Sequence, residues 1–199
     1  MIEKDYETLL NIETQGTDKY HTSHLYHRYE PTPYEVLNLL FKHYTLKPTD
    51  HVVDYGCGKG RLNFYIHYHF QVPVTGIEMN EHFYEIALRN KASYLKKHRR
   101  GQDALHFYCG LGEEYLVQPN DNKFYFFNPF SIQIFRKIVE NILVSLESHY
   151  RDIELILYYP SDDYQYFLDN RTPFILKKEI SLPNTQKDHR ERFLIYGLC

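Results

Sequence analysis

The chain has 199 residues, of which 43% are hydrophobic and 25% charged, with a net charge of −3; this composition is that of an ordinary globular protein. No segment approaches the ~20 apolar residues that span a bilayer, and the N-terminus lacks a secretory signal pattern. Three cysteines do not indicate a disulfide framework. We therefore predict one cytoplasmic domain over residues 1–199 with no membrane partner, and the net charge gives no general indication of nucleic acid binding.

The N-terminal part contains little readable pattern before residue 31. We predict that residues 1–30, with a short helical pattern, form an extension or lid in front of a core of residues 31–199. The segment TPYE then predicts a helix start, with Thr32 as the cap, Pro33 in the first turn and Glu35 at the capping-box position. Apolar residues recur at helical spacing over the turns that follow.

Strands and helices alternate through the rest of the chain. Helices are predicted after the first strand, over 80–101 and along an apolar stripe between 135 and 146. Strands are predicted at 51–55, 72–78, 104–109, 123–128 and 152–159, followed by an antiparallel pair at 174–182 and 192–198. This order predicts an α/β fold with a doubly wound, Rossmann-like, mostly parallel seven-stranded sheet that closes with a C-terminal antiparallel hairpin. Ligands are expected at the carboxyl ends of the strands.

The segment VVDYGCGKGRL, residues 52–62, is the most unusual stretch of the sequence. Gly56, Gly58 and Gly60 alternate between a predicted strand and a predicted helix. Glycines there let a ligand approach the backbone, and free amides at a helix start favour a polar or anionic group. The dinucleotide fingerprint would place its third glycine at position 61, which is Arg61. A tight turn without any ligand is the simpler alternative.

A carboxylate at the end of the second strand narrows the choice of ligand. Glu78 ends VTGIE, 22 residues after Gly56. A carboxylate at this place can accept hydrogen bonds from both hydroxyls of a ribose. The glycine turn and this acid together predict a ligand that contains a nucleoside. The plain alternative is that Glu78 is an ordinary surface glutamate without a ligand.

The two segments resemble the motifs of a known enzyme family. VVDYGCGKGRL resembles the first motif of the class I S-adenosylmethionine-dependent methyltransferases, and VTGIEMN resembles their second. The resemblance covers about residues 31–199 and implies S-adenosylmethionine as the cofactor. It implies that Asp54 orders the loop around the amino-acid end of the cofactor, that Gly56 and Gly58 line it, that Glu78 binds the ribose and that Met79 packs against adenine.

Further cofactor contacts follow from the same resemblance. YEPTPY, with Tyr29 and Thr32, resembles a segment that closes over the cofactor in related enzymes. Cys57 belongs to the site by its place in the glycine turn, where a small side chain suffices and no catalytic thiol is expected. The family often has an acid after the third strand to meet the adenine amine. Here that place holds Cys109 and Gly110, and Glu113 or Glu114 is the substitute that the sequence offers.

The predicted fourth strand ends in FFNPF. Asn128, Pro129 and Phe130 resemble the motif of amino-group methyltransferases, which implies that Asn128 faces the methyl donor and orients an amine while the aromatic ring stacks on a base. That motif has two prolines, whereas this sequence has one. An Asn-Pro turn with a packed Phe is the plain alternative. The expected acceptor is a nitrogen on a protein, a nucleic acid or a small molecule.

Three other interpretations remain open from the sequence. A non-catalytic module could keep this fold and act through partners, and a nicotinamide-dependent oxidoreductase fits the alternation but not the glycine spacing. The basic segments LKKHRRG and KDHRER could contact phosphate, although cations at a helix end are expected from its dipole alone. Histidines recur at 21, 24, 27, 67 and 69, but no partner arrangement accompanies them, so we predict no metal site.

Overall fold

The computed structural model describes residues 3–16, 29–99, 101–183 and 185–198, without the side chain of Gln102, and all structural statements refer to these residues. Its seven strands are β1 (Val52–Tyr55), β2 (Val74–Glu78), β3 (Leu105–Cys109), β4 (Lys123–Phe127), β5 (Glu154–Tyr158), β6 (Phe174–Ser181) and β7 (Arg192–Leu198).

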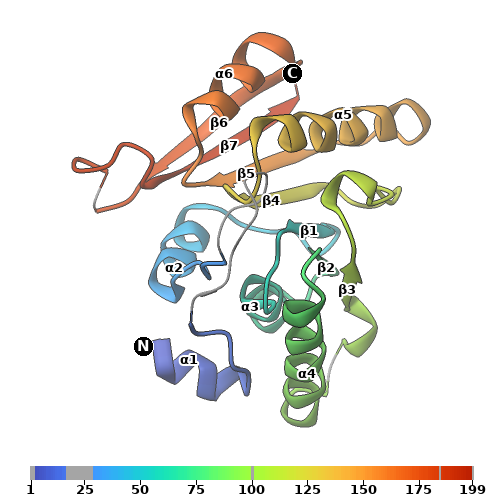
Figure 1. Ribbon diagram of the computed structural model, residues 1–199, viewed down its shortest axis with the longest axis vertical. Helices are drawn as coiled ribbons and strands as arrows, with labels where there is room; N and C mark the ends of the chain where they lie inside the picture. The colour runs from blue at the N-terminus through green and yellow to red at the C-terminus, as the bar shows by residue number, and fades with distance from the viewer. Residues whose placement is uncertain (1–2, 17–28, 100, 184, 199) are drawn as a thin grey trace.

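One sheet contains all seven strands in the order β3-β2-β1-β4-β5-β7-β6 (Figure 1). The five strands from β1 to β5 pair in parallel, and β7 pairs antiparallel to both β5 and β6. The predicted fold is confirmed. The strand order reverses between β1 and β4, so the carboxyl ends of these two strands form the switch point at which α/β sheets bind ligands.

Helices cover both faces of the sheet (Figure 1). One face of the sheet shares an apolar core with the first four helices, which are α1 (Glu3–Leu10), α2 (Tyr34–His43), α3 (Arg61–Phe70) and α4 (Glu81–Lys97). The opposite face is covered by α5 (Ile132–Ser148) and α6 (Asp162–Arg171), with the short 3-10 turns η1 (Gln102–Ala104) and η2 (Gly112–Glu114) in the connections around β3.

Burial accounts for this arrangement. Strand β1 is buried on both sides, as expected for the centre of a parallel sheet. Alternate residues of the strands point into the two cores: Val52 into the first, Val53 and Tyr55 into the second. The Tyr55 ring stacks on Phe126 of the neighbouring strand at 5.0 Å. Burial of a large apolar side chain stabilises a fold by ~1.5 to 3 kcal/mol.

Two predictions about helices need correction. The first is the capping box at the start of α2. Helix α2 begins at Tyr34, with Pro33 at the cap position and no side-chain cap bond. Thr32 instead shares a 2.9 Å hydrogen bond with the Tyr125 hydroxyl. A residue before proline is held extended, so Thr32 lies one residue too early to cap the helix, and Glu35 makes no capping box.

The second correction is an omission, because helix α6 was not predicted. Its sequence is polar, with Asp162 and Asp163 in the first turn, and the Ser161 hydroxyl caps it by accepting from the Tyr164 N–H. A Ser followed by two Asp is a start signal. Only three buried residues tie the helix to the core, and that is too few to create a strong apolar stripe: Tyr164, Phe167 and Leu168.

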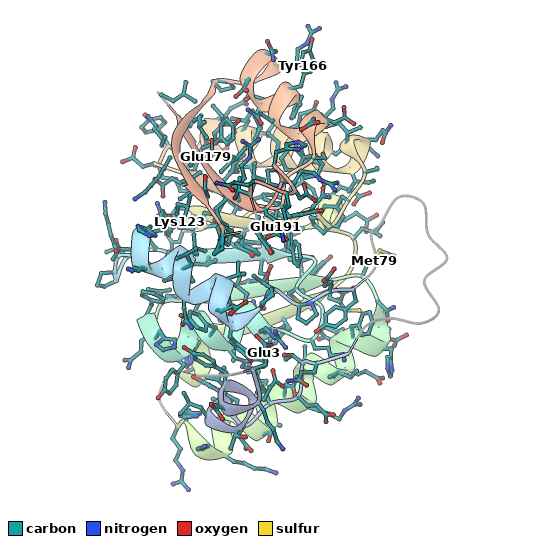
Figure 2. The ribbon with its side chains drawn as sticks, turned by 90° about the vertical axis from the view of Figure 1, so that its left-hand side faces the viewer. Glu3, Met79, Lys123, Tyr166, Glu179 and Glu191 are labelled. Atoms are coloured by element: carbon teal, nitrogen blue, oxygen red, sulfur yellow. The ribbon has the colours of Figure 1, made fainter. Side chains whose placement is uncertain are left out.

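The two ends of the parallel strands lie on opposite sides of the molecule. Figure 2 shows Lys123, at the start of β4, on one side and Met79, just after the end of β2, on the other. The candidate site is on the side of Met79. In the described part of the chain, no helix is long and apolar enough to cross a membrane.

Candidate active site

The glycine turn joins β1 to α3 at the switch point. The Gly56 and Cys57 N–H groups donate to the Ile77 carbonyl at 2.9 and 3.0 Å, which fixes the turn beside β2. Gly56 and Gly58 have φ of +79° and +55°, values that L side chains rarely adopt. A Cβ on Gly56 would lie 2.8 Å from Pro129 Cβ. The first glycine therefore lets the residues after β4 approach the backbone of the turn.

Glu78 lies next to this turn, at the end of β2. Its Oε2 accepts from the Gly58 N–H and its Oε1 from the Asn80 N–H, both at 2.8 Å. The residue is only 8% exposed. Burial raises the pKa of this carboxyl, and the two amides act in the opposite direction. The carboxylate is thus held in one orientation, and each oxygen keeps a second lone pair for a ligand.

Asp54 is the second buried carboxylate of the site. Asn63, with its amide oriented to satisfy both neighbours, donates to Asp54 Oδ2 at 3.0 Å and accepts from the Gly76 N–H at 3.1 Å. Burial, with a smaller contribution from the charge of Glu78, raises the pKa of Asp54 to about 8. Within the described ranges neither Asp54 nor Glu78 forms an ion pair with a basic side chain. Two buried acids without a cation favour a ligand that carries positive charge.

The residues after β4 occupy two different environments. Asn128 is half-buried with φ of +39°, a left-handed conformation that Asn tolerates better than most residues. Pro129 packs on Gly56. Phe130 is 4% exposed; its N–H donates to the Tyr164 hydroxyl at 3.2 Å, and that hydroxyl donates to the Phe130 carbonyl at 2.6 Å. The Phe130 ring therefore lies in the core, and its predicted stacking on a base would require it to leave this packing.

Tyr29 reaches the glycine turn from the N-terminal part. A Cβ on Gly58 would lie 2.1 Å from the Tyr29 ring, so the ring packs directly on this glycine. The same ring contacts Phe83 at 4.7 Å between centroids, and the Tyr29 hydroxyl donates to the Thr14 carbonyl at 2.6 Å. Phe83, in the first turn of α4, was missed by the sequence interpretation because an aromatic residue near a helix start reads as ordinary packing.

The end of β3 lies beside Glu78. Cys109 pairs with Glu78 in the parallel register, and the Gly110 N–H donates to the Glu78 carbonyl at 3.0 Å. Met79 is 41% exposed at the same edge. The predicted substitutes for an adenine-binding acid lie in η2, which packs against α5 on the other face. The backbone at 109–110, rather than the carboxylates of η2, is therefore brought to the end of β2.

The described Cys57 and His67 side chains are packed or hydrogen-bonded within the protein. Cys57 is buried, burial raises the pKa of its thiol, and its side chain packs on Gly76. His67 is fixed by the Tyr94 hydroxyl at 2.8 Å and the Gly101 carbonyl at 2.9 Å. The histidines at 21, 24 and 27 fall outside the described residues. Elsewhere no group of three potential ligands could hold a metal ion.

A second left-handed residue follows the neighbouring strand. Tyr159, directly after β5, has φ of +51°. Its hydroxyl donates to Asp188 Oδ2 at 2.5 Å, and the Arg190 guanidinium lies over its ring at 4.5 Å. The connection between β6 and β7, which the sequence presents only as a basic-leaning loop, thus reaches the end of β5. An open hollow of about 620 Å³ lies between this connection and the start of α6.

Comparisons with known proteins agree with this geometry. A protein-family model described as a methyltransferase domain matches residues 32–116. An rRNA adenine N-6-methyltransferase from Escherichia coli is 31% identical over 128 residues, which are 63% of this chain and 46% of that protein. The chain thus spans about half the length of this curated relative.

Solved structures share the fold at low sequence identity. An RNA methyltransferase from Salinibacter ruber in complex with S-adenosyl-L-homocysteine superposes with a TM-score of 0.59 at 15% identity, covering 85% of this chain and 92% of that one. The Pyrococcus abyssi tRNA (uracil-54, C5)-methyltransferase, in complex with the same compound, has a TM-score of 0.54 at 16% identity, with 86% and 40% covered. The mitomycin 7-O-methyltransferase MmcR has a TM-score of 0.60 at 12% identity, with 83% and 53% covered. The chain therefore has the fold of these methyltransferases, and its residues 32–116 match a methyltransferase domain model.

Proposed function

We propose that this protein is an S-adenosylmethionine-dependent methyltransferase that methylates a nitrogen atom of an RNA base. The observation that carries the proposal is the Glu78 carboxylate, which two backbone amides fix at the end of β2, next to the glycine turn. A carboxylate in this place suits a ribose. We propose a cytoplasmic location for the enzyme.

The residues around the switch point fit an adenosyl amino acid. Glu78 would bind the ribose hydroxyls, and the backbone at 109–110 with Met79 would border the base. Asp54 and the turn at Gly56 and Gly58 would hold the amino-acid end, where two buried carboxylates suit a ligand with a sulfonium and an ammonium group. Tyr29, packed on Gly58, and Thr32 would close the site on the N-terminal side.

The chemistry asks the protein chiefly for alignment. S-adenosylmethionine supplies an activated methyl group when it is bound. The protein's own part is to hold donor and acceptor in line and to exclude water. Asn128 is fixed directly after β4, and its neighbour Pro129 packs on the glycine turn. An oxygen there would accept a hydrogen bond from the acceptor amine and keep the nitrogen lone pair directed at the methyl group.

RNA is the acceptor that the relatives favour. The E. coli relative is an adenine N-6-methyltransferase of rRNA, and the Asn-Pro-Phe segment here suits the same type of atom, an amino nitrogen on a planar base. The O-methyltransferase with this fold shows that the fold alone does not select the acceptor. The alternative of a non-catalytic module has no support in these comparisons.

Two measurements test the proposal. Calorimetric titration should show binding of S-adenosylmethionine and its demethylated product but not of NAD. Transfer of a radiolabelled methyl group to a cell extract should label material that ribonuclease destroys and protease leaves intact. No binding of either adenosylated compound would refute the function, and label that follows protein would refute the RNA acceptor.

The ribose assignment has its own variant. Glu78→Ala should weaken S-adenosylmethionine binding roughly 100-fold, because hydrogen bonds to a charged acceptor are lost and two amides are left without a partner. Glu85→Ala, an exposed glutamate of α4, is the matched control and should bind like the wild type. Unchanged affinity in Glu78→Ala would remove Glu78 from the cofactor site.

A further inference from the structure

A buried arginine lies directly behind the glycine turn. Arg61 is the first residue of α3 and only 4% exposed. A cation at the start of a helix is unfavourable, because the helix dipole is positive there. A buried charge also requires partners that replace its water shell. The position of Arg61 therefore needs a reason beyond the helix itself.

The described partners of Arg61 come from the N-terminal part of the chain. Its Nη1 donates to Glu3 Oε2 at 2.6 Å and to the Thr32 carbonyl at 3.2 Å. Its Nε donates to Thr14 Oγ1 at 2.7 Å, and its guanidinium lies over the Tyr34 ring at 4.4 Å. Figure 2 shows Glu3 at the end of α1 that faces the elements above that helix. One side chain thus joins α1, the segment after it and the start of α2.

A second set of bonds fixes the segment around Thr14. Glu7 accepts from the Thr14 N–H at 2.6 Å and the Thr14 hydroxyl at 2.5 Å, and lies 3.5 Å from Arg61 Nη2. The Lys59 ammonium donates to the Gln15 carbonyl at 2.6 Å. The Thr14 carbonyl is the group that accepts from the Tyr29 hydroxyl. The chain of contacts runs from Arg61 through Thr14 to the ring that covers Gly58.

From this geometry we infer that Arg61 is a positioning residue for the cofactor site. It fixes the N-terminal segment, residues 3–16, beside the glycine turn, and Thr14 of this segment in turn binds Tyr29, whose ring packs on Gly58. Arg61 itself holds the Thr32 carbonyl. Because Arg61 follows the turn directly, the segment and the turn share one anchor. The protein binds S-adenosylmethionine tightly only in the fraction of molecules in which this segment is docked. The inferred effect on affinity rests on the proposed cofactor, whereas the bonds between Arg61 and residues 3–16 do not depend on it.

Arginine suits this role better than lysine or an apolar residue. Its planar fork supplies donors in three directions at once, to Glu3, Thr14 and the Thr32 carbonyl. A lysine has one nitrogen and could not span these acceptors. A methionine would preserve much of the packing but would leave Glu3 and Glu7 without their cation.

The absence of tryptophan from the whole sequence allows a specific reporter. Phe83→Trp places a single indole beside the Tyr29 ring, since Phe83 lies 4.7 Å from that ring. The reporter background must first be shown to bind S-adenosylmethionine like the wild type. Arg61→Met is then compared with Arg89→Met, which removes an exposed arginine of α4 whose side chain is 64% exposed.

Arg61→Met should raise the Kd for S-adenosylmethionine roughly tenfold or more, since fewer molecules have the segment docked. The indole emission should shift to the red even without ligand, because Tyr29 no longer covers it. Arg89→Met should change neither property. An unchanged Kd or an unchanged emission in Arg61→Met would overturn the inference.

A loss of general stability must be told apart from a loss of positioning. Leu168→Ala, in α6 on the far face, should lower the melting temperature through the cavity it leaves, without touching residues 3–16, and should leave the Kd unchanged. An equal loss of affinity in that variant would overturn the inference. If Arg61→Met does not fold, Glu3→Gln serves instead, with a smaller loss of affinity and the same emission shift. If no variant and no wild-type protein binds S-adenosylmethionine, the proposed function fails, and the emission alone decides whether Arg61 holds the segment.

Discussion

Carboxylates lie at both edges of the parallel sheet, but among the described residues only those at the amino edge include a pair that shares a lysine, while Asp121 beside them accepts from the Tyr115 hydroxyl and the Gln118 N–H. At the amino ends of the strands, Lys123 lies 2.8 Å from Glu154 and 3.8 Å from Asp50. At the carboxyl ends, Asp54 and Glu78 contact an amide side chain and backbone N–H groups, and among the described residues they have no cationic partner.

This difference separates a structural cluster from a binding site. Charges that are paired inside the protein hold strands together and leave little for a ligand to add. Charges that are buried without a counter-ion weaken the folded state, and a ligand cation can relieve that cost. Sites of function are where a protein tolerates such strain. This contrast supports our proposal that a positively charged cofactor binds at the carboxyl edge.

The largest change in unfolding free energy that tests this contrast is expected at Asp54. The pKa of this carboxyl is raised from 3.8 to about 8 in the folded protein, so the folded state keeps its proton after the unfolded state has lost it. Stability should therefore fall as pH rises from about 4 to about 8. Each pKa unit is worth ~1.4 kcal/mol. Asp54→Asn should accordingly be more stable than wild type at pH 9 by several kcal/mol in urea unfolding.

The same variant should lose cofactor affinity while it gains stability. Removal of an acid from a site for a cation weakens the binding of S-adenosylmethionine, which calorimetry at pH 8 measures. The same comparison below about pH 4 is the internal control, because Asp54 is then largely protonated in both the folded and the unfolded wild type, and the two proteins should be about equally stable. If Asp54→Asn were less stable than wild type at pH 9, the contrast between the two edges would be wrong.

The next effect is expected at the amino edge. Lys123→Met removes the cation that Glu154 and Asp50 share. The carboxylates then remain partly buried without compensation, which should cost ~3 kcal/mol of unfolding free energy in urea. Cofactor affinity should not change at a temperature where the variant is folded. A loss of affinity equal to that of Asp54→Asn would show that the edges are not independent.

The smallest effect is expected for the chemistry at the junction of the two strands β1 and β4. Asn128→Ala should lower turnover about 10- to 100-fold through poorer alignment of the acceptor, with donor affinity nearly unchanged. Alanine also adds strain at the positive φ of this residue, so Asn128→Gly is the matched control. Equal losses in the two variants assign the effect to the amide, whereas full activity of Asn128→Gly would assign it to the backbone.

The sequence was a good guide where the chain acts locally. Alternating apolar segments predicted the seven strands and which of them pair in parallel or antiparallel. Most predicted strand boundaries lie within two residues of the observed ones. The polar helix α6 escaped because its stabilisation comes from a few tertiary contacts such as the Tyr164 ring stacked on Phe135 at 3.7 Å. The predicted role of Thr32 as a helix cap was wrong because its hydroxyl instead bonds to Tyr125, which is 93 residues away along the chain.

The candidate site shows the same division. Asp54, the glycines and Glu78 were predicted from spacing within 25 residues of sequence, since a strand, a turn and the next strand must bring them together. The packing of Phe130 in the core and the contact of Tyr29 with Gly58 were not readable. Both depend on elements that are remote along the chain, α6 in one case and the segment around Thr14 in the other.

The sequence by itself determined the class of fold, and it predicted the edge of the sheet for the site and a nucleoside-containing ligand, because hydrophobic periodicity and the glycine–acid spacing are local properties. Tertiary structure alone decided that Asp54 and Glu78 are buried with no cationic partner among the described residues, and that Arg61 joins residues 3–16 to the turn. Burial and long-range pairing depend on which residues the fold brings together, and a buried arginine reads in sequence like any other charge at a helix start.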